Sequence, residues 1–194
     1  MNMTRPEQIE IRWHGRGGQG AVTSANLLAE AAFYAGFKGV TSAPAFGAER
    51  RGAPITASTR LASEPLRHFS QVENPDIIVV LDSSLLATAN AVRGLAEMGH
   101  VIVNSRLAPE DLGLSNGYQI ATADADRVAE EIELRASGVI MVNTAMLGAI
   151  ARATGLISLD DIDKALAKTF SPKAAKKNME AARLTYECTR CSFE

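Results

Sequence analysis

The chain has 194 residues, of which 46% are hydrophobic and 22% charged, and its formal net charge is −2. These values are typical of globular proteins and exclude a disordered, collagen-like or disulfide-scaffold chain. The near-zero net charge argues against a dedicated nucleic-acid-binding protein, which needs a large basic excess. Two cysteines cannot hold a fold of this size together, so the expected location is the reducing cytoplasm.

No membrane segment is expected either. Residues 1–8 are polar and lack the apolar stretch of a signal peptide. The most apolar segment, residues 139–151, is too short to span a bilayer and contains Asn143 and Thr144. We therefore expect a cytoplasmic protein without membrane or nucleic-acid partners.

Strands and helices alternate along the first part of the chain. Ile9, Ile11 and Trp13 alternate with charged residues, which predicts a first strand. Apolar residues from Ala21 onward recur every three or four positions and predict a helix that Gly36 ends. The later strands are predicted at residues 38–42, 55–61, 76–81, 101–103 and 119–122, with a helix over 85–96 that Gly99 ends.

From Asp124 onward the pattern is helical, with predicted helices at residues 124–134, 139–153, 159–170 and 172–188. Ser158 can cap the third of these, and Pro172 occupies a first-turn position where proline is tolerated. Asn143 would lie inside an apolar helix, where we expect it to satisfy neighbouring backbone or a subunit contact.

The alternation predicts an α/β fold with a mostly parallel sheet, helices on both faces and a C-terminal helical extension. Residues 43–54 have too little helical pattern for a crossover connection, so we expect a mixed sheet. A single domain over residues 1–194 is expected, with its α/β part at about 8–122 and its helical part at about 124–190.

A glycine-rich loop, Gly15-Arg16-Gly17-Gly18-Gln19-Gly20, lies between the first predicted strand and helix. Such a loop lets the backbone approach a phosphate, and the helix start offers unpaired N–H groups. A nicotinamide site also needs an acidic residue roughly 20 positions further on, but no carboxylate occurs between Glu30 and Glu49. We favour a phosphate-bearing ligand or a partner surface over a tight packing turn or a stand-alone NAD site.

Residues 44–54 form a second unusual segment, in which Glu49, Arg50 and Arg51 are flanked by glycines and prolines. Long loops without secondary structure are often functional, and guanidinium groups bind phosphate or carboxylate in a bidentate manner. The alternative is a solvated charge cluster in which Glu49 pairs with an arginine. The flanking glycines and prolines indicate a specified backbone path and favour the functional interpretation.

Three segments in this order and spacing resemble the gamma subunits of pyruvate:ferredoxin oxidoreductases. They are residues 13–20, 48–54 and 72–76, which read WHGRGGQG, AERRGAP and VENPD. The resemblance extends to about Gly148. Oxidoreductases for 2-oxoglutarate usually carry a Pro-Glu-Met-Arg-Gly-Gly type second segment, so the resemblance implies pyruvate or branched-chain 2-oxoacids.

The resemblance implies one subunit of a multi-subunit 2-oxoacid:ferredoxin oxidoreductase, inactive alone, with alpha, beta and delta-type partners. The partners would hold thiamine diphosphate, magnesium and iron–sulfur clusters and reduce ferredoxin, while coenzyme A accepts the acyl group. Residues 15–20 with Glu49, Arg50 and Arg51 would contribute to a shared coenzyme A site. We expect no catalytic residue and no metal ligand in this chain, which lacks a Gly-Asp-Gly segment and four cysteines. A stand-alone nucleotide-binding module and a non-catalytic scaffold are the alternatives.

Three further features have two explanations each. Cys188 and Cys191 are expected to be thiols on a frayed chain end, or else to dock against a cluster-bearing subunit. Asp82, Ser83 and Ser84 follow a buried strand at the end where α/β sheets bind ligands, although helix capping explains them equally well. His14 could contact a ligand beside the glycine loop, but we expect a structural role.

Overall fold

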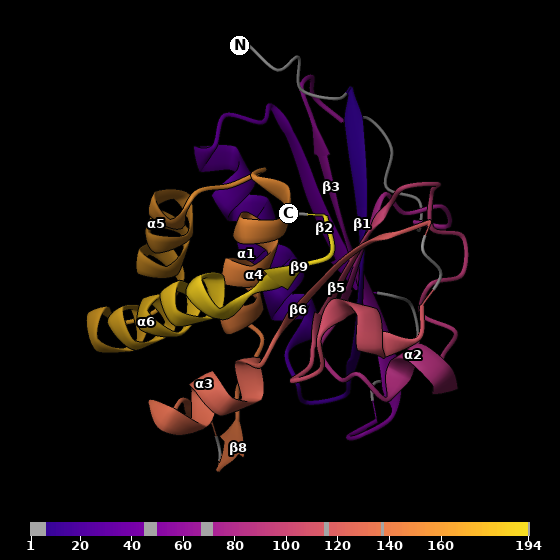
Figure 1. The fold of residues 1–194 in the computed structure, drawn as a ribbon. Helices are drawn as coiled ribbons and strands as arrows, with labels where there is room; N and C mark the ends of the chain where they lie inside the picture. The colour runs from indigo at the N-terminus through magenta and orange to yellow at the C-terminus, as the bar shows by residue number, and fades with distance from the viewer. Residues whose placement is uncertain (1–6, 45–49, 67–71, 115–116, 137, 194) are drawn as a thin grey trace.

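A computed structural model describes residues 7–44, 50–66, 72–114, 117–136 and 138–193. Its centre is a seven-stranded sheet (Figure 1). The strands are β1 (Gln8–Arg16), β2 (Gly39–Pro44), β3 (Pro54–Ala62), β4 (Ile77–Val80), β5 (His100–Asn104), β6 (Gln119–Ala123) and β9 (Arg190–Cys191).

The sheet has the strand order β2-β3-β1-β4-β5-β6-β9. Strands β1, β4, β5 and β6 are parallel to one another, whereas β3 is antiparallel to both β1 and β2, and β9 is antiparallel to β6. The prediction of a mixed sheet is confirmed. Its cause is the direct antiparallel pairing of β2 with β3, which needs no crossover helix.

One face of the sheet is covered by most of the helices (Figure 1). They are α1 (Ala21–Tyr34), α3 (Ala125–Glu131), α4 (Ala145–Thr154), α5 (Leu159–Thr169) and α6 (Pro172–Cys188). Ile9, Ile11 and Trp13 point to this face because side chains alternate along a strand. They share one core with the C-terminal helices. The C-terminal part of the chain therefore packs on the sheet, and its last strand, β9, joins the sheet beside β6.

The opposite face has a thinner cover. Ile78, Val80, Val101 and Val103 pack there against α2 (Leu85–Thr88), the 3₁₀ helix η1 (Pro109–Leu112) and irregular segments. Both faces of β4 and β5 are therefore buried, which explains the continuous apolar runs of these strands. Within the described ranges, no helix has the length and apolarity needed to cross a membrane.

The helix predicted over residues 85–96 is wrong beyond Thr88. The Arg12 side chain on β1 donates hydrogen bonds to the carbonyl oxygens of Ala91 and Arg93. Asn90 and Gly94 also have positive φ angles of 44° and 76°. Tertiary hydrogen bonds to a distant arginine thus replace the helical bonds that the apolar spacing suggested, and Gly99 ends no helix.

The helix predicted over residues 139–153 begins only at Ala145. Val139 and Ile140 instead form β8 (Val139–Ile140), which pairs with β7 (Arg135–Ala136) in a two-stranded hairpin. Gly138 has a φ angle of 80°, and β-branched residues favour extended backbone. Asn143 consequently lies before the helix and not inside it.

The predicted end of α1 and the predicted starts of α5 and α6 are confirmed, whereas α3 ends at Glu131 and not at residue 134, because Glu133 has a positive φ angle of 53°. Gly36, with a φ angle of 92°, follows the end of α1 in the left-handed conformation that glycine favours. Ser158 caps α5 in a capping box: its side chain accepts a hydrogen bond from Asp161 N, and the Asp161 side chain accepts one from Ser158 N. Pro172 occupies the first turn of α6.

Replacing Ser158 by alanine is expected to lower the free energy of unfolding by about 1 kcal/mol, because the cap of α5 is lost. For a domain of this size the melting temperature should fall by about 2–4 °C, measured by circular dichroism. Ser171→Ala is the matched control, since Ser171 is the N-cap of α6 but makes no side-chain capping hydrogen bond. Equal losses in both variants would contradict the prediction.

Candidate functional site

The candidate site lies at the carboxyl ends of β1 and β4. From β1 the chain enters α1 on one face of the sheet, and from β4 it enters α2 on the other face (Figure 1). In open α/β sheets such a switch in direction between neighbouring parallel strands opens a crevice where ligands bind. The glycine loop (residues 15–20) and Asp82 both lie at this edge.

The two loops singled out in the sequence pack against each other. Gly17 N donates to Ala53 O (2.8 Å), and Gly52 N donates to Gly17 O (3.0 Å). A Cβ atom at Gly17 would lie 2.2 Å from Arg50 O. The approach of the chain's own arginine segment (residues 50–53) is thus by itself sufficient to require glycine at position 17.

Arg16 connects three separate parts of this edge. Its Nε lies 2.6 Å from Asp82 Oδ2, its Nη2 donates to Ser84 Oγ (2.7 Å), and its Nη1 donates to Gly52 O (3.1 Å). Gln19 Oε1 accepts a hydrogen bond from Arg16 N (2.7 Å). The Arg16 side chain therefore joins the glycine loop to the arginine segment and to the end of β4, while Gln19 braces the glycine loop internally.

The Asp82 carboxylate is the negative partner in this arrangement. Partial burial would raise its pKa, but hydrogen bonds from Ser84 and Arg16 outweigh burial and lower the pKa below its usual value. Ser84 N also donates to Asp82 Oδ1 (3.0 Å), as an Asx turn would. Asp82 is therefore a stable carboxylate at neutral pH, and the pair with Arg16 carries little net charge.

The remaining glycines shape the start of α1. Gly15 belongs to β1, and a Cβ atom there would lie 3.2 Å from Leu81 Cδ1. Gly18 has a φ angle of 94°, and a Cβ atom there would meet nothing within 4 Å, so its backbone conformation and not packing favours glycine. Gly20 is the N-cap of α1 with a φ angle of 81°, and within the described residues α1 has no side-chain capping hydrogen bond.

Asn143 is a site residue that the sequence pattern misplaced. A Cβ atom at Gly20 would lie 2.6 Å from Asn143 Nδ2, and Asn143 O accepts a hydrogen bond from Ser24 Oγ (3.1 Å). The side chain is only 4% exposed, and its Oδ1 has no partner in the described part of the chain. A polar residue within an apolar segment was the available signal, but the periodicity assigned it to a helix.

Arg50 and Arg51 are both exposed beside the glycine loop. Among the described residues, no carboxylate forms an ion pair with either guanidinium group. Glu49, predicted to share their site, lies outside the described residues. Within the described residues, two cations without a carboxylate partner therefore lie next to a helix start that has no side-chain cap, an arrangement that suits an anion.

His14 is buried, and its side chain lies on the face of β1 opposite to that of Trp13. Its Nε2 accepts a hydrogen bond from Arg12 Nε (3.1 Å). Burial and the Arg12 charge lower its pKa from 6.5 to about 4. The unfolded chain therefore takes up this proton first, and folding stability should decrease as the pH falls from about 6.5 to about 4. This geometry supports a structural role.

Urea unfolding of the wild type and His14→Gln across this pH range measures the effect. Glutamine retains an acceptor for Arg12 but has no titrating group, so the expected result is a shallower decrease of the free energy of unfolding. His100→Gln is a second test, because burial also lowers the pKa of His100 and its replacement should make the decrease shallower in the same direction. An unchanged pH dependence in His14→Gln would contradict the assignment.

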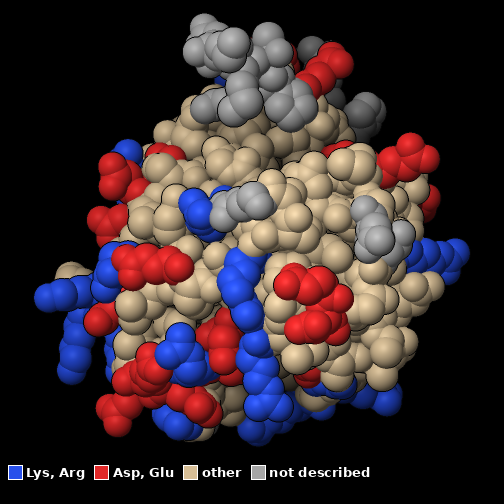
Figure 2. All heavy atoms as spheres, in the orientation of Figure 1, with Lys and Arg blue, Asp and Glu red and all other residues tan. Residues whose placement is uncertain are grey.

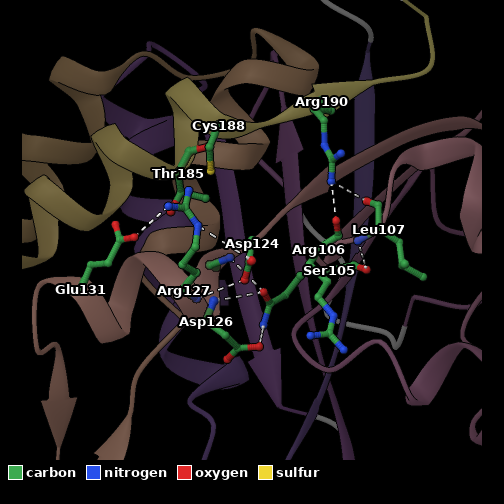
Figure 3. Close-up of polar contacts among 12 residues, drawn as sticks. Ser105, Arg106, Leu107, Asp124, Asp126, Arg127, Glu131, Thr185, Cys188 and Arg190 are labelled. Atoms are coloured by element: carbon green, nitrogen blue, oxygen red, sulfur yellow. Dashed lines mark hydrogen bonds and ion pairs between the residues drawn. The ribbon is translucent and has the colours of Figure 1, made fainter.

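The C-terminal cysteines lie on an ordered end of the chain, so the expectation of a frayed end is wrong. Arg190 of β9 donates hydrogen bonds to the carbonyl oxygens of Arg106 (2.7 Å) and Leu107 (2.8 Å), as Figure 3 shows. Cys188 and Cys191 are thiols outside any disulfide, and burial raises the pKa of Cys188. No group of three or more His, Cys, Asp or Glu residues suited to a metal ion occurs in the described ranges.

Charged side chains of both signs occur together over the lower left and lower centre of the face in Figure 2, and others lie along both edges of its upper half. The balanced composition thus reflects mixed charges and not separate basic and acidic areas on this face.

The fold and the site define an α/β protein with a glycine loop at the switch point of its sheet. The sequence matches the family of pyruvate ferredoxin/flavodoxin oxidoreductases over residues 10–188. It is 48% identical over 184 residues to the pyruvate/ketoisovalerate oxidoreductases common subunit gamma of Thermococcus litoralis, covering 93% of this chain and 97% of the relative. The chain therefore belongs to the pyruvate ferredoxin/flavodoxin oxidoreductase family.

Solved structures agree with this assignment. Pyruvate oxidoreductase subunit PORC of Thermotoga maritima is 40% identical, with a TM-score of 0.80 over 96% of this chain and 99% of its own. A 2-oxoglutarate:ferredoxin oxidoreductase of Magnetococcus marinus, with 2-oxoglutarate, coenzyme A and succinyl-CoA bound, shares the fold with a TM-score of 0.70 at 18% identity. That match covers 94% of this chain and 32% of the larger one.

Proposed function

We propose that this chain is the gamma subunit of a pyruvate or branched-chain 2-oxoacid:ferredoxin oxidoreductase and contributes to its coenzyme A site. The names of the Thermococcus and Thermotoga relatives, which align over 97% and 99% of their lengths, support the subunit assignment. One observation carries the site. The docked loops leave Arg50 and Arg51 without carboxylate partners among the described residues, beside the uncapped start of α1.

Coenzyme A carries several phosphate groups and supplies the thiol that accepts the acyl group. The start of α1 and the guanidinium groups of Arg50 and Arg51 fit such a ligand, because they offer donors and positive charge. Their role is to bind and orient it. Alpha, beta and delta-type partners would hold thiamine diphosphate, magnesium and iron–sulfur clusters and pass electrons to ferredoxin, and the cytoplasm is the proposed location.

A non-catalytic scaffold is the second candidate. Gly17 favours this candidate, because the absence of a Cβ atom there makes room for Arg50 O. Internal packing alone therefore explains one glycine of the motif. Under this alternative the arginine segment would contact only protein.

Alanine at both Arg50 and Arg51 separates the two candidates in the reconstituted complex. A charge-assisted hydrogen bond is worth about 1.5–3 kcal/mol, so the KM for coenzyme A should rise at least about tenfold. The KM for the 2-oxoacid should stay within about twofold. Arg183→Ala is the control, because Arg183 pairs with Glu187 on an exposed helix face. An unchanged KM for coenzyme A would favour the scaffold.

A further inference from the structure

The guanidinium of Arg16 is held by two chain segments that lie far from it in sequence. Asp82 and Ser84 follow β4, and Gly52 belongs to the arginine segment. The Arg16 side chain is about one third exposed (32%), and each of its three nitrogens has a partner. A ligand that approached Arg16 would have to compete with these bonds.

The same contacts fix the backbone on which Arg50 and Arg51 stand. Gly52 bonds through its N–H to Gly17 and through its carbonyl oxygen to Arg16 Nη1. Ala53 N closes the turn by donating to Arg50 O (3.0 Å). Position 52 is thus held on both sides, and Arg16 is the link that joins it to the end of β4.

We propose that Arg16 and Asp82 form a positioning pair that holds the arginine segment in place, so that Arg50 and Arg51 meet the phosphate groups of the ligand already oriented. The inference rests on the proposed function. It assigns Arg16 to positioning instead of direct ligand contact, and it gives Asp82 and Ser84 a role in the same site.

Two physical reasons support this division of roles. Flexible arginines lose conformational freedom on binding, and a fixed backbone lowers that loss. Asp82 also neutralises Arg16, so the positive charge available to a ligand remains on Arg50 and Arg51. Without Asp82, Arg16 would be released from its carboxylate and would compete for the same anion.

Arg16→Lys and Asp82→Asn test the pair. Lysine keeps the charge but cannot reproduce the three-way contact, and asparagine keeps the shape but removes the charge. In the full chain, hydrogen exchange of the Gly52 amide should be about tenfold faster in both variants. A tenfold change corresponds to a loss of about 1.4 kcal/mol in the free energy of local opening of the arginine segment. In the reconstituted complex the KM for coenzyme A should rise while kcat at saturating coenzyme A stays within about twofold.

Glu64→Gln is the matched control, because it breaks a surface pair with Lys38 of similar length (2.8 Å) away from the site. The inference is overturned if both variants leave exchange at Gly52 unchanged, even when Arg50 and Arg51 variants raise the KM for coenzyme A and so uphold the proposed function. It is also overturned if Arg16→Lys raises this KM without faster exchange at Gly52, since Arg16 would then act by direct contact. Both proposals are overturned if Arg16→Lys and Asp82→Asn speed exchange at Gly52 but the KM for coenzyme A is unchanged in them and also in the Arg50 and Arg51 variants.

Discussion

Replacing Gly148 by alanine is expected to destabilise the protein strongly. A Cβ atom at this position would lie 1.9 Å from Ala182 O and 2.9 Å from Tyr186 N, where α4 packs on the backbone of α6. Within a helix, alanine is normally favoured over glycine by about 1 kcal/mol. A backbone contact this short must outweigh that gain, and overpacking typically costs about 1–3 kcal/mol or more.

Thermal unfolding measures the effect, with an expected decrease of the melting temperature of about 5–10 °C for a net loss of about 2–3 kcal/mol. Gly113→Ala is the control. Gly113 has a φ angle of 66° but no atom within 4 Å of its Cβ position, so only the left-handed backbone opposes alanine. A larger loss at Gly113 than at Gly148 would show that the two helices can move apart at little cost.

Replacing Gly17 by alanine is expected to detach the arginine segment while the rest of the fold is retained. The new Cβ would lie 2.2 Å from Arg50 O, which belongs to the backbone and cannot rotate away. Loss of the Gly17–Gly52 and Gly17–Ala53 hydrogen bonds should follow. Because each such bond contributes about 1 kcal/mol, exchange of the Gly52 amide should accelerate at least about tenfold.

The functional consequence is a higher KM for coenzyme A in the reconstituted complex, together with a circular dichroism spectrum like that of the wild type. Gly18→Ala is the control for the loop, since a Cβ at Gly18 meets nothing within 4 Å and only its φ angle of 94° is unfavourable. If Gly17→Ala left exchange at Gly52 unchanged, the close approach of the two loops would be refuted.

The strands of the sheet were predictable because their signal is local. Alternation in β1 and the unbroken apolar runs of β4 and β5 follow directly from burial on one face or on two. The N-cap of α5 at Ser158 was equally visible, since its partner Asp161 lies only three positions further on. In these elements, neighbours in sequence supply the deciding contacts.

The errors occur where distant residues decide the backbone. Arg12 binds the carbonyl oxygens of Ala91 and Arg93 from 79 and 81 positions away and ends a helix that apolar spacing predicts. Asn143 and Ser24 are 119 positions apart, and their contact belongs to the start of α1 and not to a helix around Asn143. No local pattern contains this information.

The sequence by itself determined the α/β class, the mixed sheet and the two loops that form the site, because periodicity, glycine spacing and turn residues act over a few positions. Only the tertiary structure decided which groups the side chains of the two loops meet. Arg16 meets Gly52 and Asp82 across 36 and 66 positions, and these bonds join the glycine loop to the arginine segment and to the end of β4. The physical reason is that a guanidinium binds whichever oxygens the fold brings within reach.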